Sequence, residues 1–238
     1  MDITQKIRTK VGKIISQISQ KQISPTATLE ISKSAKITHC QMEIGNQATL
    51  RIGSKCKLHH SKIRVADHAT LTIGEGTTIF NSNLEVRYPQ ACLHIGEYCY
   101  VGSSCRFYAD ESIILGNYNM IAYDCLICDT QVHNPNWRIR RKALTQRSPQ
   151  GYPGLEPKPR TAPLIIGDDC FFGKSCVIKV AKSSNSNLTI GDRVVIGASS
   201  VVGIDIPDDY LAAGNPAKII KLLTKFREQG TGNREKLK

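Results

Sequence analysis

The sequence predicts an all-β solenoid, because an apolar residue followed by glycine recurs at intervals of six or eighteen residues. The third position after most of these glycines holds a small or β-branched residue. An amphipathic helix requires apolar recurrence near 3.6 residues and a single strand requires a period of two, so neither explains the spacing. A short strand, a corner and another short strand explain it, and such repeats stack into a solenoid. The glycines with the clearest phase are Gly167, Gly173, Gly191, Gly197 and Gly203.

The repeat extends over most of the chain and predicts one main domain, residues 23–216. Residues 23–114 carry it in a looser form, with longer coils and bulges expected at corners. From Leu115 the hexads are strict, and three hexads would complete one triangular coil. A long excursion, residues 134–163, interrupts the repeat, which resumes in phase at Ile166. We therefore expect an inserted loop on a continuous scaffold, and long loops of this kind are often functional.

The hexads and the closing segment IPDDYLAAGNPAKII together resemble the hexapeptide-repeat acyltransferase family. Within that family, the chain is similar to the bacterial polysaccharide and sugar O-acetyltransferases. The resemblance implies a left-handed parallel β-helix, a homotrimer, and acetyl-CoA as acyl donor without a metal. It also implies a saccharide acceptor, such as capsule, lipopolysaccharide or a precursor of either.

Both ends of the chain are expected to be helical. Residues 1–22 place isoleucine and valine on one stripe, with most of the lysine and arginine residues off it. This helix is expected to cover the solenoid's open end or contact a neighbouring subunit, because a solenoid end exposes unpaired strand groups. The alternative is peripheral contact with a membrane surface. Residues 217–238 are expected to form a short helix and a polar tail.

The formal net charge of +12 indicates an anionic partner. An anionic cofactor or an acidic glycan satisfies this charge. Nucleic acid is not expected as a partner, because aromatic and basic residues do not interleave and no known reader motif is present.

Most of the nine cysteines occupy the small-residue position of a hexad, where Cys packs as a small hydrophobe. Cys125 and Cys128 are therefore interpreted as packing residues and not as a redox or metal-binding pair. No signal peptide and no membrane span are recognised in the sequence. We expect reduced thiols and a cytoplasmic location.

The run Asp129-Thr130-Gln131-Val132-His133 is the candidate catalytic segment, because the repeat gives way to the long loop at His133. A neutral imidazole, with an ordinary pKa of about 6.5, accepts a proton near neutral pH. From the residues alone, a histidine that only caps a corner turn is an equally good interpretation. The resemblance implies that His133 is a general base that deprotonates the acceptor hydroxyl for direct attack on the thioester. It further implies that Asp129 orients the imidazole or holds the turn, while Gln131 departs from the family's usual Asp or Asn.

The resemblance also implies that acetyl-CoA binds in a groove between coils of neighbouring subunits. Pantetheine amides would pair with backbone groups there, and the nucleotide end would meet basic residues. Each lysine of the site is equally well interpreted as a solvated surface charge. By position in the motif, the cofactor-binding residues are Lys174, Ala198, Gly203 and Lys218.

The inserted loop is the expected acceptor site. An aromatic ring can stack on a sugar face, and arginine can pair with a carboxylate or phosphate on the sugar. The same residues also suit the phosphates of CoA. The candidate substrate-binding residues are Trp137, Arg138, Arg140 and Tyr152.

Three alternatives remain open. The first is N-acetylation of an amino sugar or another amine by the same base and cofactor. The second is a non-catalytic β-helix that binds an anionic partner. The third is a metal-dependent hydratase like the carbonic anhydrases built on a similar β-helix, although the histidines of residues 23–114 do not match that family's ligand spacing.

Overall fold

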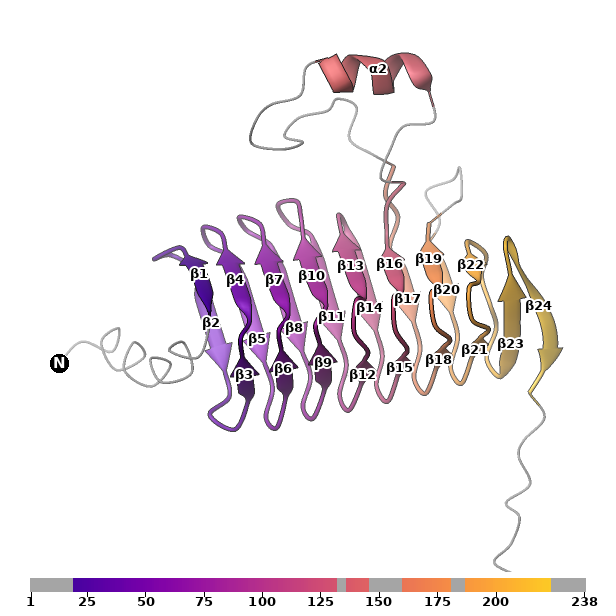
Figure 1. Ribbon diagram of the computed structural model, residues 1–238, viewed down its shortest axis with the longest axis horizontal. Coiled ribbons are helices and arrows are strands. Elements are labelled where there is room, and N and C mark those ends of the chain that lie inside the picture. Colours follow the sequence, from indigo (N-terminus) through magenta and orange to yellow (C-terminus); the bar gives the residue numbers. More distant parts are fainter. Residues whose placement is uncertain (1–18, 132–135, 146–159, 181–186, 224–238) are drawn as a thin grey trace, which may run out of the picture.

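The structure, a computed structural model, is a parallel β-helix in which each coil contributes one strand to each of three sheets (Figure 1). It describes residues 19–131, 136–145, 160–180 and 187–223. Within these ranges the sheets contain eight, seven and nine strands. All neighbouring strands pair in parallel except the last two. The predicted all-β solenoid is confirmed.

We name the sheets A, B and C in the order in which the chain passes through them. Sheet A contains β1 (Gln20–Ile23), β4 (Gln41–Ile44), β7 (Lys62–Val65), β10 (Asn83–Val86), β13 (Arg106–Ala109), β16 (Leu126–Cys128), β19 (Val177–Lys179) and β22 (Val201–Val202). Sheet B contains β2 (Thr28–Ile31), β5 (Thr49–Ile52), β8 (Thr70–Ile73), β11 (Cys92–Ile95), β14 (Ser112–Leu115), β17 (Leu164–Ile166) and β20 (Leu188–Ile190). Sheet C contains β3 (Lys36–Thr38), β6 (Lys57–His59), β9 (Thr78–Phe80), β12 (Tyr100–Val101), β15 (Met120–Ile121), β18 (Phe171–Phe172), β21 (Val195–Ile196), β23 (Tyr210–Gly214) and β24 (Ala217–Leu222). The corners are called A–B, B–C and C–A after the sheets they join.

The core is a set of aliphatic columns inside the triangle of sheets. Leu50, Leu71 and Leu93 lie in register on successive strands of sheet B, and all three are buried. The residues before them, such as Thr49 and Thr70, point outward and are partly exposed. Because side chains alternate along a strand, a slip of one residue would turn each column to the solvent. The register is therefore fixed by the alternation that the sequence shows.

The cysteines of the hexads fill small spaces under the corners. The Cys125 thiol lies 3.3 Å from the carbonyl of Gly173 on the next coil, and the Cys176 thiol lies 3.1 Å from that of Gly197. Each donates a weak hydrogen bond to that carbonyl. All nine cysteines are free thiols and eight of them are buried. The interpretation of these cysteines as packing residues is confirmed.

Replacing Gly173 with Ala is expected to destabilise the protein by about 1–3 kcal/mol, the usual cost of overpacking. An added methyl group would come within 2.6 Å of the backbone nitrogen of Ala198, and the next coil would have to shift. Gly102→Ala is the matched control at the same corner, because its methyl group would come no nearer than 3.0 Å to a neighbouring atom. Chemical denaturation of both variants measures the difference. An equal loss in both would contradict this explanation of the glycine.

Carboxylates hold the corners of successive coils together. The Asp67 carboxylate accepts the N–H of Asn46 on the previous coil at 2.7 Å, and Asp168 accepts that of Asn117 at 2.6 Å. Asp192 does the same for the Asp168 N–H at 2.9 Å. A corner N–H that points along the solenoid thus obtains a partner from the next coil, which satisfies a backbone donor that the sheets leave unpaired.

The two ends of the solenoid differ from the sequence prediction. Residues 20–22 belong to strand β1 and not to the predicted helix 1–22, because β4 offers them a parallel hydrogen-bonding partner. Residues 1–18 lie outside the described part of the chain. The predicted helix after Pro216 is also wrong for residues 217–222, which form β24 antiparallel to β23 and close the last coil as a hairpin.

The inserted segment contains one helix that the sequence analysis did not predict, α2 (Trp137–Thr145). The Asn136 side chain accepts the Arg138 N–H at 3.0 Å and so caps its first turn. In Figure 1 the helix stands apart from the coils, beyond the end of β16.

Candidate functional site

The inserted segment leaves the coils at corner A–B through a short neck. Thr130 and Thr161 form an antiparallel bridge, and the Gln131 N–H donates to the Arg160 carbonyl at 3.0 Å. Strand β17 then joins sheet B in register with β14. The insertion therefore interrupts the chain but not the stacking of the coils.

Two predicted site residues, His133 and Tyr152, lie outside the described residues. His133 follows Gln131, the last described residue of the outgoing neck, by two positions. Its role as general base stays a prediction.

Asp129 is completely buried at the base of the neck. One carboxylate oxygen accepts the Asp110 N–H at 2.8 Å, and the other accepts the N–H groups of Glu111 and Ser112 at 2.8 and 2.7 Å. Burial raises the pKa of this carboxyl from 3.8 to about 6, against the opposing effect of the three N–H donors. Asp129 was expected either to orient the His133 imidazole or to hold the turn. The three hydrogen bonds to residues 110–112 fit the second role.

The sequence analysis did not predict the partly buried ion pair of Arg87 and Asp110, which lies next to Asp129. The Arg87 guanidinium donates two hydrogen bonds to the Asp110 carboxylate, at 2.7 and 2.8 Å, and lies over the Tyr108 ring with 4.8 Å to its centroid. Burial lowers the pKa of Arg87, but the hydrogen bonds and charge of Asp110 outweigh it and raise that pKa. A signal existed in the sequence: Arg87 and Asp110 carry opposite charges at the same position of consecutive coils, where an earlier coil has Gly45.

Thr130→Val is expected to increase the free energy of unfolding by about 1 kcal/mol. The Thr130 hydroxyl is buried at the neck and is the one buried side-chain polar atom in the described part of the chain without a hydrogen-bond partner. Valine has nearly the same shape and removes this unpaired group. Thermal or chemical denaturation measures the change, with Thr161→Val as the control on the facing strand. A loss of stability in Thr130→Val would show that its hydroxyl is paired in solution.

Three of the four predicted cofactor residues lie along corner C–A. Lys174 and Ala198 occupy this corner on adjacent coils, where the Ser199 N–H donates to the Lys174 carbonyl at 2.8 Å. Lys218 pairs with Ala213, one coil further along. All three predicted residues are exposed, and the Lys174 ammonium lies 3.5 Å from the Asp124 carboxylate.

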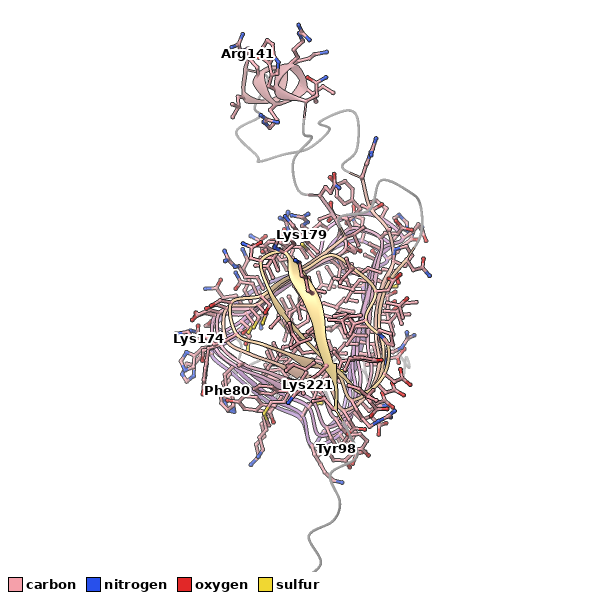
Figure 2. The ribbon with its side chains drawn as sticks, turned by 90° about the vertical axis from the view of Figure 1, so that its right-hand side faces the viewer. Phe80, Tyr98, Arg141, Lys174, Lys179 and Lys221 are labelled. Carbon is pink, nitrogen blue, oxygen red and sulfur yellow. The ribbon has the colours of Figure 1, made fainter. Side chains whose placement is uncertain are left out.

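The fourth predicted cofactor residue, Gly203, lies at the other edge of sheet A. It follows β22 at corner A–B, in the same column as Lys179 and close to the column of Asp129. Figure 2 shows this separation, with Lys174 and Lys179 at opposite edges of the sheet. Sheet A thus separates an edge with two exposed lysines from the edge that carries the loop neck.

Helix α2 brings together three predicted substrate-binding residues, Trp137, Arg138 and Arg140. The guanidinium groups of Arg138 and Arg141 each lie 4.8 Å from the centroid of the Trp137 ring. Trp137 remains 49% exposed, which leaves ring surface for a further contact. The helix contains four basic residues and no acidic residue.

Within the described ranges, no three histidine, cysteine, aspartate or glutamate side chains gather where they could hold a metal ion. No helix in the same ranges is long and apolar enough to cross a membrane.

Comparison with known families supports the prediction of a hexapeptide repeat. The sequence profile of the hexapeptide repeat of succinyl-transferase matches residues 163–181 and 187–211. These residues form the coils on the C-terminal side of the insertion and include Lys174, Ala198 and Gly203.

Two curated relatives are bacterial acetyltransferases. Galactoside O-acetyltransferase of Escherichia coli K12 is 28% identical over 129 residues, which cover 54% of this chain and 53% of the relative. WcaF of the same strain, provisionally named a colanic acid biosynthesis acetyltransferase, is 24% identical over 143 residues, 60% of this chain and 65% of the relative. The chain thus spans about half to two thirds of the length of these relatives.

Among solved structures, the polySia-specific acetyltransferase NeuO superposes with a TM-score of 0.59 at 20% identity, covering 83% of this chain and 76% of NeuO. At this identity the similarity shows the fold alone. The repeat profile and the curated relatives show that the chain resembles the hexapeptide-repeat acyltransferases, and among them the bacterial sugar O-acetyltransferases.

Proposed function

We propose that this protein transfers an acetyl group from acetyl-CoA to a hydroxyl group of a saccharide. The main support is the similarity to two curated relatives, which are named for galactoside and for colanic acid biosynthesis. The geometry supports the proposal, because the candidate catalytic segment leaves a rigid coil through a hydrogen-bonded neck. A rigid support of this kind is what an oriented general base requires.

In the proposed reaction, His133 accepts the proton of the acceptor hydroxyl as the oxygen attacks the thioester carbonyl. The carbon–sulfur bond then breaks, and the CoA thiolate leaves as a thiol after it takes up the proton from the His133 imidazolium, which restores the neutral base. A neutral imidazole suits this step because its pKa lies near the working pH. Asp129 acts at the base of the loop, where it holds the turn of residues 110–112.

The donor is proposed to bind along corner C–A. Gly173 lies against Ala198 on the next coil, and Gly197 lies against Ala213. The small residues of this row would let a pantetheine chain come close to the backbone. Lys174 and Lys218 flank the row and would pair with the phosphates of CoA. Gly203 is less suited to this contact, since it lies across sheet A from the other three cofactor residues.

A homotrimer would bring corner C–A of one subunit against its neighbour. The adjacent outer face of sheet C carries large apolar side chains that are exposed to solvent in the monomer, including Met120 (51% exposed) and Phe171 (40% exposed). Exposed apolar groups that lie next to one another are typical of subunit contacts. We expect light scattering to give three times the mass of the chain.

The acceptor is proposed to lie against α2. Trp137 offers an exposed ring, and Arg138 and Arg140 offer charge on the same helix. An acidic saccharide would use both features, because its ring stacks on the aromatic face while its acid group pairs with arginine.

The test is the release of CoA thiol from acetyl-CoA in the presence of neutral glycans, acidic glycans and free amines. We expect release with a saccharide that lacks a free amine. Release only with amines would favour N-acetylation. If acetyl-CoA did not bind, the proposed reaction would fail and a non-catalytic binding role would replace it.

A further inference from the structure

Corner A–B carries a continuous polar ladder on three successive coils, formed by Arg87, Asp110 and Asp129. Arg87 holds both carboxylate oxygens of Asp110 through its Nε and Nη2 atoms. The Asp110 backbone N–H then donates to Asp129 at 2.8 Å. The side chain of Arg87 is 24% exposed and that of Asp110 is completely buried.

At its last residue, Asp129, the ladder contacts both segments of the neck, the outgoing residues 130–131 and the returning residues 160–162. Asp129 continues directly into Thr130 and Gln131 on the outgoing limb, and its carbonyl accepts the Ala162 N–H of the returning limb at 3.1 Å. The side chain of Arg87 is thereby connected, through two coils, to the point where the inserted loop leaves and returns.

This arrangement differs from the other carboxylate caps of the solenoid. Asp67 and Asp168 each accept the backbone N–H of one residue on the previous coil, whereas Asp129 accepts three. At the position of Arg87 two earlier coils have Gly45 and Ala66, so the fold closes this corner without an ion pair.

Stability alone does not explain the pair. The desolvation free energy of an arginine and an aspartate offsets much of the free energy gained from their attraction. Well-packed apolar side chains at the same place are often as stabilising. A bidentate Arg–carboxylate pair does fix direction, because its two parallel hydrogen bonds allow little rotation. The pair therefore supplies a defined geometry at the corner from which the loop departs.

We infer that Arg87 and Asp110 are positioning residues for acetyl transfer, acting through Asp129 to fix the direction of the neck that carries the loop with His133. The inference rests on the proposed function. Neither residue is assigned a contact with substrate or with the reacting atoms.

The test uses Arg87→Lys in the full-length protein. Lysine keeps the charge next to Asp110 but loses the two-pronged hydrogen bonding. Arg193→Lys is the matched control, because Arg193 holds Asp209 with the same two atoms, at 2.6 and 2.9 Å, on corner B–C. Ile79→Val, in the buried core under sheet C, controls for a general loss of stability.

Two readouts are measured: hydrogen exchange at the Gln131 and Ala162 amides, and kcat and KM for acetyl transfer. For Arg87→Lys we expect exchange at both amides to rise tenfold or more and kcat to fall about tenfold, with an unchanged KM for acetyl-CoA. Arg193→Lys and Ile79→Val are expected to keep the wild-type values in both readouts.

Wild-type exchange at the neck of Arg87→Lys would overturn the inference, because the ladder would not hold the neck. Faster exchange with a wild-type kcat would also overturn it, since the ladder would then be structural only. Failure of the proposed function has a different signature: the wild-type protein itself would transfer no acetyl group, and no positioning role would remain.

Discussion

Replacing His133 with Ala is expected to lower kcat for acetyl transfer by about 10²–10⁴-fold, the usual contribution of a general base. Affinity for acetyl-CoA should stay unchanged, because the donor is proposed to bind along corner C–A. Thiol release at saturating acetyl-CoA measures the first quantity, and calorimetric titration measures the second.

The matched control for His133 is His94→Ala. His94 lies on the outer face of sheet B in β11, is exposed, and belongs to a coil two coils before the one that carries β16 and the neck. Its loss should leave kcat at the wild-type value. Equal activity of wild type and His133→Ala would show that another group takes the acceptor proton, and the catalytic assignment would have to move from this segment.

Asp129→Asn is expected to destabilise the protein by about 1–3 kcal/mol near pH 4. At pH 4 the Asp129 carboxyl is protonated, because its folded-state pKa is about 6, but both of its oxygens can still accept hydrogen bonds. The NH₂ group of an amide cannot accept, so at least one N–H among residues 110–112 would face it inside the protein. Asp67→Asn is the control at the same corner. Its carboxylate is exposed and accepts one backbone N–H, that of Asn46, with a longer bond of 3.4 Å from the Asn46 side-chain amide, so the loss should be smaller.

The effect of Asp129→Asn should also depend on pH. Burial raises the folded-state pKa of Asp129 to about 6 from 3.8, so its titration favours folding most below pH 3.8. This contribution is lost as the pH rises through 6, and the stability difference between wild type and variant should shrink by up to about 3 kcal/mol between pH 4 and pH 7. Denaturant titrations at four pH values measure it. A difference that grows with pH would mean that the three N–H donors outweigh burial.

The fold was predictable because the signal is periodic. Each hexad requires an inward aliphatic residue and a small corner residue. Every coil therefore indicates the same strand register, as the column of Leu50, Leu71 and Leu93 does. The ends were not predictable in this way. Residues 217–222 have apolar spacing that suits a helix, but the edge of β23 pairs with them as a strand, and tertiary context overrides local preference.

The candidate site was predictable only in part. Motif position placed Lys174, Ala198 and Lys218, and the structure brings them to one corner, while it separates Gly203 from them. The sequence does not reveal that Asp129 binds the turn of the previous coil, because its partners are backbone groups, which carry no residue identity. The link from Arg87 to the neck needs the coil register, which a linear pattern does not give.

The most direct test of the proposed function is the position of the transferred group. The protein is incubated with acetyl-CoA labelled with ¹³C in the acetyl carbonyl and with the saccharide that supports thiol release, and the product is examined by NMR. We expect the label in an ester on a sugar oxygen, removable by mild alkali, and its absence when His133→Ala replaces the wild type. Label in an amide, or an equal amount of ester with the variant, would contradict the proposal of His133-dependent O-acetylation.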